Sequence, residues 1–267
     1  MRTKVILVVL DGCRPDGLAQ ARTPHLDRLW QTGAYTWAAR SVAPSLSLPT
    51  HMSMFRGVSP QRHGVEDNTF NPAAARYPSV LELAGRAGLR AAMFYSWEEL
   101  RDLAAPGSLA LSYCRAFDPG EDTDRIVARA AAEYIVTAQP DLTFLYLGSV
   151  DLIGHDDGWM SAPYIRGIEN LDGAVGDVVS VLEDAGLRDS FTFLALADHG
   201  GHDHGHGSDR PDDLTIPWML NGPGVKQGYA IQTPLVIMDT AATIAHLLDL
   251  PRPEVWEGRP ILDALYD

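Results

Sequence analysis

Three short apolar segments of the chain each lead to an aspartate, and this pattern constrains the fold more than any other feature. The segments are residues 4–10, 142–147 and 191–197, and the aspartates are Asp11, Asp151 and Asp198. Segments of this length, rich in Val, Ile, Leu and Phe, are typical of strands buried on both faces of a parallel sheet. Because the carboxyl ends of parallel strands share one edge, we expect the three carboxylates to lie together.

Strand-like and helix-like segments alternate along the rest of the chain. Further strands are expected at 34–39, 89–95, 109–113 and 218–221, and helices from Pro24 and at 79–87, 122–138, 161–185 and 239–248. This order predicts an α/β fold with a mostly parallel central sheet and helices on both faces. We find no internal repeat or linker, so we expect residues 1–267 to form a single domain.

Charge and cysteine content narrow the function. The formal net charge of −14 and the pI of about 4.9 argue against a nucleic-acid-binding surface. They allow a phosphate ester as substrate, because bound divalent cations reverse the local field. Cys13 and Cys114 are expected to be buried thiols in a reducing compartment, so a cytoplasmic location is predicted. No apolar run reaches about 18 residues, and no membrane span or signal peptide is expected.

A stretch of hydroxyl side chains, residues 43–51, is the strongest candidate for a nucleophile. Pro49 suits the first position of a helix, where a missing N–H costs nothing. A hydroxyl just before it would face free backbone N–H groups and the positive end of the helix dipole, which favours attack on a phosphoryl group. Ser45, Ser47 and Thr50 compete for the role, and each needs activation at neutral pH.

Histidines accompany two of the three aspartates. His155 follows Asp151 by four residues, which places both side chains on one face of a helical turn. His199 is adjacent to Asp198, and His202, His204 and His206 come soon after. Carboxylate and imidazole together suit zinc, and two ions about 3.5–4 Å apart would activate a hydroxyl and neutralise a leaving oxygen. For the last three histidines, a surface loop that binds nothing is the alternative.

Several motifs stand in the order found in the alkaline phosphatase superfamily, and the chain resembles its type I phosphodiesterase/nucleotide pyrophosphatase branch. The motifs are Val9-Leu10-Asp11-Gly12, Thr23-Pro24-His25-Leu26, Pro44-Ser45-Leu46-Ser47-Leu48-Pro49-Thr50-His51, His63-Gly64-Val65, Asp151-Leu152-Ile153-Gly154-His155 and Ala197-Asp198-His199-Gly200. The resemblance covers nearly the whole chain. It implies a compact catalytic domain without the large cap region of bigger members.

The resemblance also implies a site with two divalent metal ions, zinc above all, with manganese as the alternative. It assigns Asp11, Asp198 and His199 to one ion. It assigns Asp151, His155 and a later histidine to the other, where His206 matches better than His204.

The same resemblance gives Ser47 the place of the nucleophile, beside both metals and in contact with them. Thr50 matches an asparagine of the branch and is predicted to bind a phosphoryl oxygen. Trp159 replaces a proline of the branch, and two interpretations stay open: a platform for an organic group of the substrate, or a surface aromatic.

These observations predict a metal-dependent hydrolase of small phosphate esters, with diesters or nucleotide pyrophosphates favoured, that works through a phosphoseryl intermediate. A phosphomonoesterase or phosphonate hydrolase on the same site is the nearest alternative. A manganese-dependent phosphosugar mutase is an alternative of another class, although mutases of the superfamily carry an inserted cap. The oligomeric state and the leaving group stay open.

Overall fold

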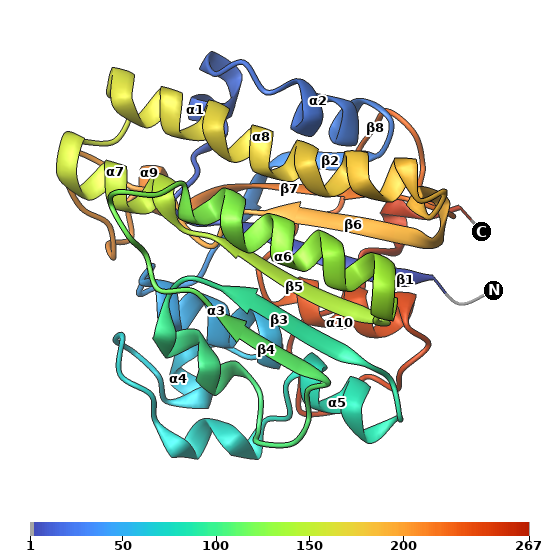
Figure 1. Cartoon of the computed structure of the whole chain (residues 1–267). Helices are drawn as coiled ribbons and strands as arrows, with labels where there is room; N and C mark the ends of the chain where they lie inside the picture. Colours follow the sequence, from blue (N-terminus) through green and yellow to red (C-terminus); the bar gives the residue numbers. More distant parts are fainter. Residues whose placement is uncertain (1–2, 267) are drawn as a thin grey trace.

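A computed structural model describes residues 3–266, and its strands form one eight-stranded sheet (Figure 1). The order across the sheet is β4-β3-β5-β1-β6-β7-β2-β8. Among these strands only β7 runs opposite to the others, because it pairs antiparallel with both β6 and β2. The strands are β1 (Lys4–Leu10), β2 (Ala34–Arg40), β3 (Ala91–Tyr95), β4 (Leu111–Cys114), β5 (Leu142–Leu147), β6 (Phe191–Leu196), β7 (Thr215–Asn221) and β8 (Tyr229–Ala230). The predicted α/β fold with a mostly parallel sheet is confirmed.

Helices cover both faces of the sheet. On one face α6 and α8 lie side by side across the strands, with α1 and α2 beyond them, and on the other face lie α3, α5 and α10 (Figure 1). The α-helices are α1 (Pro15–Gln20), α2 (Pro24–Gln31), α3 (Ser47–Arg56), α4 (Pro60–His63), α5 (Val80–Arg86), α6 (Thr123–Ala138), α7 (Ser149–Asp157), α8 (Ala162–Asp184), α9 (Pro211–Leu214) and α10 (Asp239–Leu247). This two-sided cover explains why the central strands are apolar on both faces.

The register of the central strands brings the aspartates to one edge. Leu10 of β1 pairs with Leu147 of β5, and Val9 pairs with Leu196 of β6. The chain leaves all three strands at the same level, so the residues that follow them converge. The side chains of β1 from Val5 onward are fully buried, which fixes this register against slippage.

The structure corrects three local expectations. Helix α3 begins at Ser47 rather than at Pro49, so the hydroxyl of Ser47 belongs to the first helical residue. Pro49 is the third residue, where its missing N–H is still one that has no partner inside the helix. Cys13 is buried as predicted, but Cys114 is exposed because it ends the edge strand β4. Asp239 is the first residue of α10, and its carboxylate accepts bonds from the Val236 and Arg259 amides rather than capping the helix.

Within residues 3–266, we find no helix that is both long and apolar enough to cross a membrane. The cytoplasmic location stays a prediction.

The contact between the sheet and α3 generates a test of stability. The fully buried rings of Phe144 on β5 and Phe55 on α3 meet edge to face, with centroids 4.9 Å apart. Replacing Phe144 with alanine leaves a cavity beneath the helix that begins with Ser47. We expect Phe144→Ala to lower the free energy of unfolding by about 3–5 kcal/mol in urea titration. Leu262→Ala, at a side chain that is 54% exposed, serves as control and should change it by less than about 0.5 kcal/mol.

Candidate metal-binding and active site

The first cluster at the sheet edge joins Asp11 to Asp198 and His199. Asp11 directly follows β1. Asp198 and His199 are the second and third residues after the end of β6. The Nε2 atom of His199 lies 3.2 Å from Asp11 Oδ1 and 3.3 Å from Asp198 Oδ2. All three side chains are buried, and their ligand atoms are close enough together to share one metal ion.

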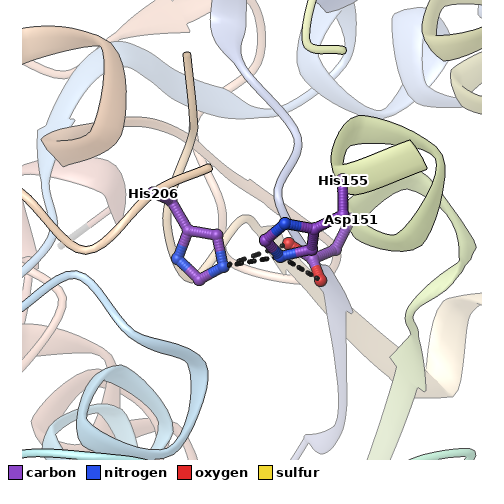
Figure 2. Close-up of side chains that lie close together, drawn as sticks. All are labelled: Asp151, His155 and His206. Carbon is purple, nitrogen blue, oxygen red and sulfur yellow. Dashed lines mark hydrogen bonds and ion pairs between the residues drawn. The ribbon is translucent and has the colours of Figure 1, made fainter. Parts of the chain in front are cut away.

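The second cluster joins Asp151 and His155 to His206. The first two lie one turn apart on α7, and His206 comes from the loop after β6 (Figure 2). His206 Nε2 lies 3.5 Å from Asp151 Oδ1 and 3.1 Å from His155 Nε2, and His155 Nε2 lies 3.6 Å from Asp151 Oδ2. The His206 ring stacks on that of His199 with centroids 3.8 Å apart, so the two clusters are neighbours.

Backbone carbonyls fix the tautomer of each histidine. The Nδ1 atoms of His155, His199 and His206 lie 3.0, 2.8 and 2.8 Å from the carbonyl oxygens of His204, Gly200 and Ser45. A carbonyl only accepts, so each Nδ1 carries a proton, and each ring turns its Nε2 toward the cluster. Metal-binding histidines are oriented in the same way.

Electrostatics make these clusters unfavourable without a cation. Burial lowers the pKa of His206 to about 3 and also lowers that of His199, so both rings are neutral at pH 7. Burial, together with the nearby charge of Asp11, raises the pKa of Asp151 and Asp198 well above the usual range. The charged forms of these two carboxyl groups are therefore unfavourable here, and a bound cation would stabilise them.

Two buried oxygens, Asp11 Oδ1 and Asp151 Oδ1, have no hydrogen-bond partner among the described residues. One belongs to each cluster, and a divalent cation in each would satisfy both. The residues present therefore fit a two-metal site.

Neighbouring donors hold the carboxylates in place. The Tyr146 hydroxyl donates to Asp11 Oδ2, and the Gly12 amide donates to Asp198 Oδ1 at 3.2 Å. Burial alone would raise the pKa of Asp11, but His199, His51 and the Tyr146 hydroxyl outweigh it and lower that pKa. Asp11 is therefore the carboxylate of the three that stays charged most readily.

Ser47 lies where the two clusters meet a cavity. Its Oγ is 3.1 Å from His199 Nε2, and the residue is 6% exposed. A cavity of about 220 Å³ is lined by Ser47, Asp151, His155 and His206, among others. The competing hydroxyl of Ser45 instead donates to the Ser208 carbonyl at 2.8 Å.

The structure places Thr50 away from the cavity, and its binding to a phosphoryl oxygen stays a prediction. Its side chain is fully buried and does not line the cavity, and its hydroxyl donates to the Ser47 carbonyl at 2.8 Å and to Asp198 Oδ2 at 3.2 Å. Asn68, which sequence reasoning missed, does line the cavity, and its Oδ1 accepts a bond from the Leu48 amide at 3.0 Å. This contact leaves the amide nitrogen of Asn68 as the atom for a ligand. Asn68 lies 21 residues from Ser47 in an irregular loop, so no periodic pattern could have indicated it.

The structure also separates the three late histidines. Of these, only His206 joins a cluster: His202 Nδ1 lies 2.7 Å from Asp213 Oδ1, and His204 Nδ1 lies 3.0 Å from the His155 carbonyl. Trp159 fits neither of its two sequence-based interpretations. It is buried, and its Nε1 donates to the Gly12 carbonyl at 2.9 Å, so it packs beneath the site.

The family model of type I phosphodiesterase / nucleotide pyrophosphatase matches residues 5–215. Mouse ectonucleotide pyrophosphatase/phosphodiesterase family member 3 is 26% identical over 217 residues, which is 73% of this chain and 24% of that protein. Venom phosphodiesterase 1 of Crotalus adamanteus is 24% identical over 226 residues, covering 74% of this chain and 26% of that protein. The chain thus spans about a quarter of the length of these relatives.

Solved structures share the fold. Human ectonucleotide pyrophosphatase/phosphodiesterase 5 superposes with a TM-score of 0.84 at 16% identity, covering 99% of this chain and 100% of that one. A 2-O GAG sulfatase superposes with a TM-score of 0.78 at 15% identity, covering 97% and 73%. The match of the family model over most of the chain shows that it belongs to the type I phosphodiesterase/nucleotide pyrophosphatase family.

Proposed function

We propose that this protein is a metal-dependent hydrolase of phosphoric diesters in which Ser47 is the nucleophile. The observation that carries the proposal is the pair of clusters whose potential ligand atoms converge beside the Ser47 hydroxyl. Asp11, Asp198 and His199 would hold one cation, and Asp151, His155 and His206 the other. Mixed oxygen and nitrogen ligands favour zinc, with manganese as the alternative.

When bound, two such cations lower the pKa of a nucleophilic hydroxyl and neutralise the phosphoryl and leaving oxygens. Ser47 Oγ loses its proton to water and attacks phosphorus, so a new P–O bond forms. The P–O bond on the opposite side breaks, and the leaving oxygen takes up a proton from water and departs as the alcohol. Water then attacks the phosphoseryl group and releases Ser47 and the phosphomonoester. The position of Ser47 as first residue of the ten-residue helix α3 adds a favourable dipole toward the anionic phosphoryl group. The Asn68 amide is available to donate to a nonbridging oxygen.

Diesters are favoured over monoesters because the curated relatives are named as pyrophosphatases and phosphodiesterases. We test this with matched nitrophenyl mono- and diesters. A kcat/KM at least tenfold higher for the diester is expected, and a tenfold preference for the monoester would reverse the assignment. A mutase would instead move phosphate within one sugar without releasing it.

The first prediction concerns metal content. Protein purified without chelator should contain two divalent ions per chain by elemental analysis, one for each cluster. Exhaustive chelation should abolish hydrolysis, and zinc or manganese should restore it. Full activity in the metal-free protein would contradict the proposal.

The second prediction separates His206 from its neighbour His204. His206→Ala removes a ligand atom from the second cluster and should leave about one ion per chain. His204→Ala is the matched control: the His204 carbonyl that orients His155 remains, so metal content should be unchanged. Loss of metal in the His204 variant, with metal retained in the His206 variant, would show that His204 is the ligand instead of His206.

The third prediction concerns the nucleophile. Ser47→Ala removes the attacking oxygen and leaves the carboxylates and imidazoles of both clusters in place. We expect folding and metal content to persist while kcat falls on the order of 10³-fold or more. Residual turnover would reflect direct attack by water.

One further variant and a mapping experiment control for the neighbouring hydroxyls. Ser45→Ala should have a much smaller effect, since that hydroxyl is bonded to the Ser208 carbonyl. An acid-quenched reaction mapped by mass spectrometry should find phosphate on Ser47. Phosphate on Ser45 or Thr50, with Ser47 unmodified, would show that Ser47 is not the nucleophile.

A further inference from the structure

A second cavity lies at the edge of the sheet where β1 and β6 begin, which is the edge near both chain ends (Figure 1). Its volume of about 570 Å³ is within the range of roughly 300–1,000 Å³ that is usual for small-molecule sites. Arg188, three residues before β6, and Asn221, the last residue of β7, both line it. The two metal-binding clusters lie beyond the other end of β6, whose six residues span roughly 20 Å. The cavity is therefore separate from the site around Ser47.

Basic side chains line this cavity, although the chain as a whole carries a net charge of −14. Arg188 is joined there by Arg28 and His25 of α2, and Asp189 is the one carboxylate among the described lining residues. Arg28 Nη1 lies 2.8 Å from Glu183 Oε1, but both of these side chains are exposed. Because an exposed ion pair adds little stability, the Arg28 guanidinium can turn toward an anion in the cavity.

Arg188 differs from the other arginines of the described chain that are not exposed. Five such arginines exist, and Arg188 is the one that forms no ion pair with a carboxylate. The other four, each paired with an aspartate or a glutamate, are Arg14, Arg56, Arg115 and Arg125. The protein thus supplies a counterion to its less accessible guanidinium groups everywhere except at this cavity.

Neutral groups hold the Arg188 guanidinium instead. Its Nη1 donates to the Phe191 carbonyl at 3.1 Å, its Nη2 donates to Asn221 Oδ1, and the group lies 4.6 Å from the centroid of the Phe193 ring. These two bonds leave further N–H donors of the five that a guanidinium carries. Burial lowers the pKa of Arg188, and the more distant charge of Asp189 only partly offsets this effect. An anion in the cavity would supply the missing compensation.

We propose that this cavity binds a small organic phosphate or phosphonate, with its dianionic group between Arg188 and Arg28 and a planar apolar group beside Tyr266. Planar guanidinium groups bind phosphoryl oxygens through paired N–H donors. The Tyr266 ring lines the cavity and is 62% exposed, and the Tyr266 amide donates to the Gly224 carbonyl at 2.9 Å. Neither metal-binding cluster contributes a described residue to this cavity, so the inference does not depend on the proposed hydrolase activity.

Calorimetry with phenylphosphonate tests the proposal, because this ligand carries a phenyl ring and has no ester bond to hydrolyse. Titration of the full chain before and after removal of divalent ions separates this cavity from the two clusters, since binding here needs no metal. We expect the metal-free protein to bind one phenylphosphonate dianion per chain, at least about tenfold more tightly than benzenesulfonate, which has one charge fewer. Binding should weaken as ionic strength rises. Equal affinity for the two ligands, or no saturable binding up to about 10 mM, would overturn the proposal.

Variants locate the bound anion. Arg188→Gln should weaken phenylphosphonate binding at least about tenfold, and Arg28→Gln should weaken it about threefold. Arg86→Gln is the matched control, because Arg86 is also 65% exposed and paired with a glutamate but lies on α5, on the other face of the sheet. Unchanged affinity in both cavity variants would show that the two guanidinium groups only stabilise the ends of α2 and α8, and would contradict the proposal.

A variant of the exposed ring tests the organic part of the ligand and does not rely on the folding of the Arg188 variant. Tyr266→Ala keeps the amide that donates to Gly224 and should weaken phenylphosphonate binding about threefold, with little effect on methylphosphonate, which lacks a ring. If Arg188→Gln does not fold, Arg28→Gln and Tyr266→Ala, both at exposed side chains, decide the question. Unchanged affinity in these two variants would then overturn the proposal.

Discussion

Buried carboxyl groups and imidazoles that crowd together without a bound cation dominate the carboxyl edge of the sheet. Three buried or nearly buried carboxyl groups and three imidazoles meet there, and two of the carboxyl oxygens lack any partner among the described residues. Burying such groups is unfavourable unless a compensating charge arrives. The Tyr146 hydroxyl and the Gly12 amide offset part of this cost by donating hydrogen bonds to Asp11 and Asp198. Bound cations would offset the rest. The hydroxyl of Ser47 points into the same field, which ties its reactivity to the occupancy of the clusters.

The sequence predicted most of the sheet because its central strands are continuous apolar runs with polar ends. Strands β1, β5 and β6 fall within a residue of their expected limits, since a strand buried on both faces has few ways to begin or end. The convergence of Asp11, Asp151 and Asp198 followed from strand direction alone. The antiparallel direction of β7 could not be predicted from the sequence. This strand is as buried as the parallel strands, and only its pairing distinguishes it from them.

Contacts between residues on different loops could not be predicted from the sequence. Thr50 and Asn68 are both polar residues near Ser47. Thr50 is buried and hydrogen-bonded to Asp198, whereas Asn68 lines the cavity. Which of them faces a substrate depends on how residues 64–70 fold back on the start of α3, and that path is set by single hydrogen bonds such as the one to the Leu48 amide. The buried position of Trp159 arises in the same way. Gly154 and Gly201 lie against its ring, where a Cβ would come within 2.6 and 2.2 Å of it.

The loop that carries His206 shows how a glycine-rich segment can present a ligand in one orientation. Asp213 is fully buried and accepts bonds from Ser208 Oγ at 2.7 Å and from the Ser208 amide at 2.9 Å, while His202 lies 2.7 Å from its other oxygen. Burial raises the pKa of Asp213, but Ser208 and His202 outweigh this and lower it below the usual range, so it acts as a charged anchor. The anchor fixes the chain on both sides of His206, and the bond from His206 Nδ1 to the Ser45 carbonyl then sets the ring. Histidines alike in sequence thus differ in role because His202 secures the backbone that aims His206 at Asp151.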